Sequence, residues 1–287
     1  MNLISKTVGF IGVGYMGYGI AKNILKKNFN LKIIAHKNRE PIDKLIKIGA
    51  KEVFTYDDLT NNTDCIIICV TNTKIAKEVA SKIVKSIEKN SILIDITTHN
   101  ERGSIEVANI LSSKAIKYVE CPVMGGPVQA EEGILGGIVG ANDEDFKDCK
   151  KYLLSFCKNI FHFGPVGNAA KAKLISNFLS LGTATFVIET IKAAKHFNID
   201  LQKLYDVAKL GSGNSGALTR IADKAIKGDY KGYIFSVENT LKDFTYINEM
   251  LKDLPNAEKL SSLSKEIYNE ANKKGYGKLL VSELIKK

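Results

Sequence analysis

The pattern of apolar and polar positions divides the chain into two regions. In the first region, short and nearly continuous apolar runs alternate with segments of helical spacing, such as Ile75 to Val84. This alternation is typical of a parallel sheet that is buried on both faces. Strands are predicted at 8–11, 31–35, 64–70 and 91–97, with shorter ones at 117–120, 136–139 and 159–163. The region is therefore predicted to be a doubly wound α/β domain.

Beyond Gly164 the pattern is that of helices alone, which predicts a second, all-helical domain. We predict domain limits of 1–163 and 164–287, with the long helix that begins near Asn168 joining the two directly. The expected helices are 168–196, 201–210, 218–227, 237–252, 257–273 and 278–286.

Residues 7–25, TVGFIGVGYMGYGIAKNIL, place three glycines between a predicted strand and a predicted helix. In this G-x-G-x-x-G pattern the first glycine permits a tight turn, the second lets a pyrophosphate approach the backbone, and the third lets helix and strand pack closely. The helix start offers unpaired N–H groups to phosphates. A glycine-rich turn without ligand is the alternative, but the flanking strand and helix favour a Rossmann dinucleotide site. Its expected contact residues are Gly12, Val13, Gly14, Tyr15, Met16 and Gly17.

The composition narrows the possible partners and the compartment. The net charge of +10 comes almost entirely from lysine, without a basic block or zinc-like spacing, so a solvated surface is favoured over nucleic-acid binding. Five cysteines without metal-like pairing fit a reducing compartment. No apolar stretch is expected to approach the roughly 20 residues that cross a bilayer, and no signal peptide is evident, so no membrane partner and a cytoplasmic location are predicted. Apolar positions in the C-terminal helices predict a homodimer or homotetramer.

Two further motifs suggest chemistry. Gly125-Gly126, bracketed by prolines, has successive N–H groups that could bind an anion, although a plain turn would look the same. Lys173 and Asn177 are four residues apart and share one face of the long helix. An ammonium and an amide on one face suit a reacting carbonyl. From the spacing alone, however, two solvated polar residues are the favoured interpretation.

Taken in order, these motifs resemble the β-hydroxyacid dehydrogenases, the group of 3-hydroxyisobutyrate dehydrogenase, tartronate semialdehyde reductase and the glyoxylate/succinic semialdehyde reductases. Asp95-Ile96-Thr97-Thr98 is similar to the family's D-x-S-T segment, and residues 122–126 match its substrate loop. The resemblance implies that Lys173 is the catalytic general acid/base and that a small anionic aldehyde or hydroxy acid is the substrate. The implied substrate contacts are Thr98, Met124, Gly125, Gly126, Asn177, Phe235 and Asp243, and Val70, Thr71, Thr98 and Lys242 are implied to contact the nicotinamide cofactor.

One departure bears on the substrate. The family's loop usually reads P-V-S-G-G, with the serine hydroxyl on the substrate carboxylate, whereas this chain carries Met124. The resemblance also leaves two alternatives, a non-catalytic nucleotide-binding protein and an imine reductase. Related branches with those properties lack the catalytic lysine, so Lys173 favours carbonyl chemistry.

The end of the second predicted strand bears on the choice between NADP and NAD. NAD enzymes place an acidic residue there to accept from the ribose hydroxyls. This chain instead has His36, Lys37, Asn38 and Arg39 before its first acid, Glu40. Cations suit a 2′-phosphate, and the tripeptide 36–38 aligns with the N-R-T of NADP-using members, so NADP is favoured and NAD is the alternative. None of the histidines receives a catalytic role, and His99 is predicted to lie in a surface loop.

Overall fold

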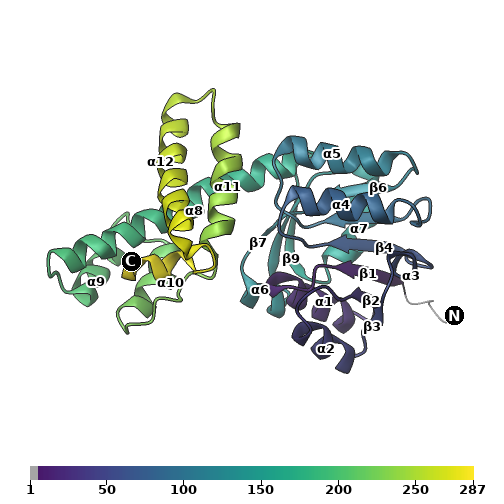
Figure 1. Cartoon of the computed structure of the whole chain (residues 1–287), viewed down its shortest axis with the longest axis horizontal. Helices are drawn as coiled ribbons and strands as arrows, with labels where there is room; N and C mark the ends of the chain where they lie inside the picture. Colours follow the sequence, from purple (N-terminus) through teal and green to yellow (C-terminus); the bar gives the residue numbers. More distant parts are fainter. Residues whose placement is uncertain (1–5) are drawn as a thin grey trace. The chain divides into compact units, whose positions relative to one another are not determined.

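The computed structural model describes residues 6–287, and the chain forms two compact units (Figure 1). The first unit, up to Lys173, contains the two sheets, and the second, Leu174–Lys287, is helical. Helix α8, Asn168–His196, begins in the first unit and continues in the second. The predicted fold class is confirmed. The domain limit at residue 163 stays a prediction.

The larger sheet has six parallel strands in the order β3-β2-β1-β4-β5-β6. Ile11 pairs with Ile68, and Ile68 pairs with Asp95, so β1, β4 and β5 end at the same edge of the sheet. Open α/β sheets bind ligands at this edge, beside the point where the strand order reverses. The strands are β1 Thr7–Ile11, β2 Asn30–Ile34, β3 Lys51–Val53, β4 Cys65–Ile68, β5 Ile92–Asp95 and β6 Lys117–Glu120.

Successive residues of a strand point to opposite faces of the sheet, and in these strands both sets of side chains are apolar. Phe10 packs into one core, whereas Ile11 packs into the other. The first core also takes side chains from α1 Tyr15–Lys26, α2 Glu40–Lys47, α6 Pro127–Glu132 and α7 Asp143–Leu153. The second takes them from α3 Tyr56–Thr60, α4 Thr73–Ile83 and α5 Glu101–Ser112. This two-sided burial explains the continuous apolar runs in the sequence.

A second, three-stranded sheet contains β7 Val123–Met124, β8 Leu135–Val139 and β9 Cys157–His162. Strand β8 pairs antiparallel with β7 and parallel with β9. The apolar pattern predicts neither β3 nor β7, because two or three residues are too few to show a period. Strand β7 nevertheless holds Val123 and Met124, within the predicted substrate loop, against β8.

The second unit packs its helices around one apolar core that includes Leu181, Phe244 and Tyr268. Its further helices are α9 Leu201–Leu210, α10 Gly216–Ala225, α11 Val237–Met250 and α12 Pro255–Ala271, followed by the π-helical turn η1 Asn272–Tyr276 and the 3-10 helix η2 Val281–Lys286. Helices α11 and α12 lie side by side (Figure 1). The last predicted helix, 278–286, corresponds to η2, which is shorter and of the tighter 3-10 type.

Helix α8 corrects one sequence prediction. It has 29 residues and an 18-residue window of mean hydropathy 1.4, so by length and composition it could cross a membrane. The prediction that no stretch approaches this length is wrong. Within that window 44% is buried, and the core helix of a globular unit meets the same criteria, so this feature is weak evidence for a membrane.

Candidate active site

The turn between β1 and α1 requires glycine for two different reasons. Gly12 has a φ of +99°, and a Cβ there would lie 2.1 Å from the carbonyl oxygen of Cys69. A Cβ at Gly17 would lie 2.1 Å from the oxygen of Gly12, where the helix meets the turn. Gly14 has no such neighbour within 4 Å. The first and third glycines thus make the turn, and the second leaves its backbone open to a ligand.

The start of α1 fits a pyrophosphate. Gly14 caps the helix without a side chain, and Tyr15 is 89% exposed, whereas Val13 is buried and Met16 packs against the core. The first N–H groups of an α-helix have no partner within the helix, and its dipole favours an anion. The residues predicted around the glycines are therefore arranged as a dinucleotide site requires.

The cationic residues after β2 differ in whether their charge is already paired with a carboxylate. His36, Lys37 and Asn38 are exposed. Arg39 is exposed as well, but its guanidinium forms ion pairs with Glu52 and with Asp43. These two carboxylates raise the pKa of Arg39 above its ordinary value. An added phosphate would have to compete with them, so Lys37 is the cation more readily available to it.

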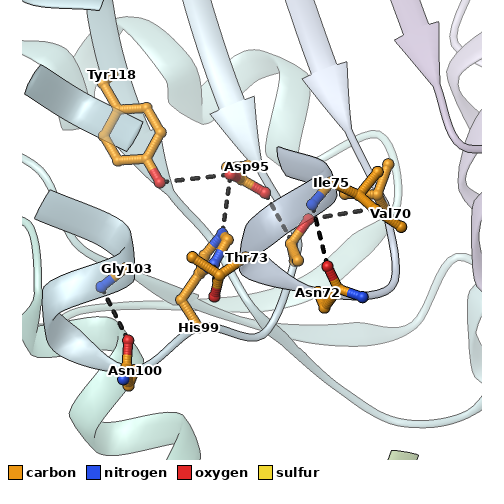
Figure 2. A network of polar contacts seen from close by, with 10 residues as sticks. Val70, Asn72, Thr73, Ile75, Asp95, His99, Asn100, Gly103 and Tyr118 are labelled. Carbon is orange, nitrogen blue, oxygen red and sulfur yellow. Dashed lines mark hydrogen bonds and ion pairs between the residues drawn. The ribbon is translucent and has the colours of Figure 1, made fainter. Parts of the chain in front are cut away.

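The loops after β4 and β5 are joined by polar contacts at the ligand edge of the sheet (Figure 2). The Val70 N–H donates to Thr97 Oγ1 at 3.3 Å, and the Thr97 N–H donates to Asp95 Oδ1 at 2.9 Å. Thr71 is exposed, and Thr98 is half-buried. The predicted cofactor residues Val70, Thr71 and Thr98 therefore belong to two loops that are held together.

The prediction that His99 lies in a surface loop is wrong, because its side chain is 1% exposed. Its Nε2 lies 3.0 Å from Asp95 Oδ2, and its Nδ1 lies 2.9 Å from Thr73 Oγ1 (Figure 2). Asp95 Oδ2 also accepts from the Tyr118 hydroxyl at 3.5 Å. Buried polar groups need partners, and these contacts bind the start of α4 to the loop after β5. In the sequence, only the four-residue spacing of Asp95 and His99 could have indicated the contact between them.

Lys173 lies in the first unit near the start of α8 and is only 9% exposed. Its Nζ donates to the carbonyl oxygen of Val123 at 2.8 Å and lies 3.4 Å from Met124 Sδ. The interpretation of Lys173 as a solvated lysine is therefore wrong. The structure brings the predicted lysine and the predicted substrate loop together through strand β7.

The two glycines of that loop differ. Gly125 has a φ of +117°, and a Cβ there would lie 2.8 Å from Leu135 Cδ2. The N–H of Gly126 donates to Gln129 Oε1 at 2.9 Å. An anion at Gly126 would have to compete with this side chain, which the sequence did not indicate.

The remaining predicted residues lie in the second unit. Asn177 is buried, and its Nδ2 donates to Asp243 Oδ2 at 2.7 Å. Asp243 is buried as well, and its Oδ1 lies 3.0 Å from Lys242 Nζ. Phe235 is partly buried against the helical core. Asn177, Asp243 and Lys242 are thus linked in one cluster on α8 and α11, by a hydrogen bond between the first two and an ion pair between the last two.

Two family models match the chain. One, described as the NAD binding domain of 6-phosphogluconate dehydrogenase, matches residues 7–164. The other, described as NAD-binding of NADP-dependent 3-hydroxyisobutyrate dehydrogenase, matches residues 167–287.

The chain is also similar to curated relatives and to solved structures. The chain is 25% identical over 272 residues to the cytokine-like nuclear factor N-PAC of Anopheles gambiae, with 94% of this chain and 48% of that protein covered. It is 33% identical over 209 residues to a probable mitochondrial 3-hydroxyisobutyrate dehydrogenase of Dictyostelium discoideum, with 72% and 63% covered. The chain thus spans about half to two thirds of the length of these two. A 3-hydroxyisobutyrate dehydrogenase structure from Salmonella typhimurium has the same fold, with a TM-score of 0.90, 24% identity, and 98% and 99% covered.

The six-stranded sheet, the glycine turn and the matched models define a protein of the nicotinamide-dinucleotide-binding class. Within that class, the chain belongs to the β-hydroxyacid dehydrogenase family.

Proposed function

We propose that this protein is an oxidoreductase that transfers a hydride between a nicotinamide cofactor and a small hydroxy acid or semialdehyde. The observation that carries the proposal is the buried ammonium of Lys173, held at the substrate loop by Val123. Membership of the β-hydroxyacid dehydrogenase family supports the same reaction class.

Each residue has a defined task in this reaction. The turn Gly12–Gly17 and the start of α1 bind the pyrophosphate, because their N–H groups are available to an anion. The bound nicotinamide supplies or accepts the hydride. Lys173 Nζ donates a proton to the carbonyl oxygen during reduction and takes it back during oxidation. Asn177, one helical turn further along α8, orients a substrate oxygen while Asp243 holds its amide.

The substrate is proposed to be small and anionic, with its distal charge at the backbone of Gly125 and Gly126, where it would displace the Gln129 side chain from the Gly126 N–H. Met124 offers no hydroxyl to that charge and lies beside the Lys173 ammonium instead. The direct test is a panel of glyoxylate, succinic semialdehyde, tartronate semialdehyde and sulfonated semialdehydes, followed by the loss of nicotinamide absorbance. Turnover of at least one carbonyl compound is expected. No turnover of any of them with either cofactor would contradict the proposal.

NADP is the proposed cofactor, with NAD as the alternative. The exposed His36, Lys37 and Asn38 after β2 support NADP, since a 2′-phosphate can pair with Lys37 by charge-assisted hydrogen bonds. Arg39 contributes less in this proposal because Glu52 and Asp43 hold it.

A non-catalytic role is the second candidate, because the chain also resembles N-PAC, a nuclear factor by name. Imine reduction is a third candidate. Lys173 disfavours both, since neither role needs a buried ammonium at the substrate loop. Unchanged nucleotide binding together with no carbonyl turnover would favour the non-catalytic role, and turnover of cyclic imines alone would favour the third.

A homodimer or homotetramer in the cytoplasm is part of the proposal. Leu179 and Phe186 on α8 and Val207 and Leu210 on α9 are between 67% and 89% exposed, and large exposed apolar surfaces favour association. Light scattering of the purified protein tests this, and a monomeric mass would contradict it.

A further inference from the structure

Glu120, the last residue of β6, is a buried carboxylate to which the proposed reaction gives no task. Glu120 is only 1% exposed. Its Oε1 accepts two backbone hydrogen bonds, from the N–H of Gly167 at 2.6 Å and from the N–H of Ala169 at 2.9 Å. These donors lie 47 and 49 residues further along the chain, at the start of α8. Glu120 therefore caps α8 from a neighbouring strand.

The fold makes room for this carboxylate. Gly140 forms a β-bridge with Glu120, and a Cβ at Gly140 would lie 2.2 Å from Glu120 Oε1. Burial raises the pKa of Glu120, although the Ser104 hydroxyl and the N–H groups of α8 act in the opposite direction. A buried carboxylate costs free energy unless it is well hydrogen-bonded, and the two N–H groups at the start of α8 provide such bonds to Glu120 Oε1.

The same segment of chain also holds Lys173. Glu120 binds the first turn of α8, and Val123, only three residues further on, accepts the hydrogen bond of the Lys173 ammonium. Ala169 and Lys173 are one helical turn apart. The acceptor of the lysine and the cap of its helix thus belong to one short stretch, 120–123. A change in the cap would shift the helix turn that carries Lys173 relative to Val123.

We propose that Glu120 is a positioning residue for Lys173, which acts by fixing the first turn of α8 so that the ammonium lies at the carbonyl oxygen of Val123 and the thioether of Met124. This proposal rests on the proposed role of Lys173 as proton donor. A purely structural role of Glu120 would lower stability and leave the turnover of the folded enzyme unchanged.

The kinetic test compares Glu120→Ala and Glu120→Gln with the control Glu101→Gln in the full-length protein. Glu101 also pairs with α8, through Lys171, but in an exposed ion pair 2.8 Å long, which contributes little. For Glu120→Ala we expect kcat to fall roughly 10-fold while KM for the cofactor stays the same, because misplaced reacting groups lose rate. Glu120→Gln keeps an acceptor oxygen and should lose less, roughly threefold. Wild-type kcat in the folded Gln variant would overturn the proposal, whether or not the Ala variant folds.

A second measurement does not depend on catalysis. Reductive methylation with ¹³C-formaldehyde labels the lysines, and the Lys173 resonance is identified by its loss in Lys173→Ala. Its chemical shift should change in both Glu120 variants and stay as in wild type in Glu101→Gln. An unchanged resonance in both Glu120 variants would overturn the proposal. If the wild-type protein reduces no carbonyl compound, the proposed function fails, and this measurement still decides whether Glu120 positions Lys173.

Discussion

The ammonium of Lys173 donates a hydrogen bond to the main-chain oxygen of Val123, 50 residues earlier in the chain and 2.8 Å away. If this ammonium is the proton donor, Lys173→Ala should lower kcat by about 10² to 10⁴-fold, the usual contribution of general acid catalysis. Steady-state kinetics measure kcat, and fluorescence titration measures cofactor affinity, which should not change. Lys171→Ala is the matched control, since Lys171 lies on the same helix but pairs with Glu101 at the surface. Near wild-type turnover in Lys173→Ala would remove the lysine from the mechanism.

Replacing the buried His99 by alanine should destabilise the first unit. The substitution leaves Asp95 Oδ2 and Thr73 Oγ1 without their imidazole partner, and each lost buried hydrogen bond costs about 1–3 kcal/mol. Urea unfolding followed by circular dichroism measures the free energy. His196→Ala is the control because His196 is exposed and should change stability little. Equal unfolding midpoints for the two variants would mean that the Asp95–His99–Thr73 contacts contribute nothing to stability.

The cofactor preference should depend on Lys37 more than on Arg39. Lys37→Ala is expected to weaken NADPH binding on the order of 10-fold and to leave NADH binding unchanged, because only NADPH carries the 2′-phosphate. Arg39→Ala should have a smaller effect on NADPH, since its guanidinium already pairs with Glu52 and Asp43. The comparison of kcat/KM for both cofactors decides this. A wild-type preference for NADH, or equal NADPH affinity in Lys37→Ala, would contradict NADP as the cofactor.

Glu120 predicts a pH dependence of stability. Burial raises its pKa in the folded state above the ordinary value of 4.5. Between that value and the higher folded pKa, the folded protein binds a proton that the unfolded chain has released, so the free energy of unfolding falls as the pH rises through this window. Glu120→Gln cannot titrate and should lose this component. Urea unfolding from pH 4.5 upwards tests it, and parallel pH curves for the two proteins would show that Glu120 does not titrate as predicted.

The class of fold and the dinucleotide turn follow from short stretches of sequence. Continuous apolar runs such as those of β4 and β5 arise because both faces of a parallel strand are buried, and this is visible in any four or five consecutive residues. The glycine pattern is local at Gly17, where a Cβ would meet the backbone of Gly12, whereas a Cβ at Gly12 would meet Cys69, just after β4. The order and spacing of the family motifs then indicated Lys173 and Asn177 before any contact was known.

Which polar side chains are buried, and which groups they contact, depends on how distant elements of the fold come together. The spacing of Lys173 and Asn177 favours solvent exposure, and the sequence left His99 on the surface and Glu120 without a role. Their environments depend on partners far along the chain: Val123 for Lys173, Thr73 for His99, and Gly167 for Glu120. Arg39 likewise has a carboxylate from the neighbouring strand β3 as a partner. Periodicity records which face of one element is apolar, whereas the pairing of polar groups between elements depends on strand order and register, which no single segment encodes.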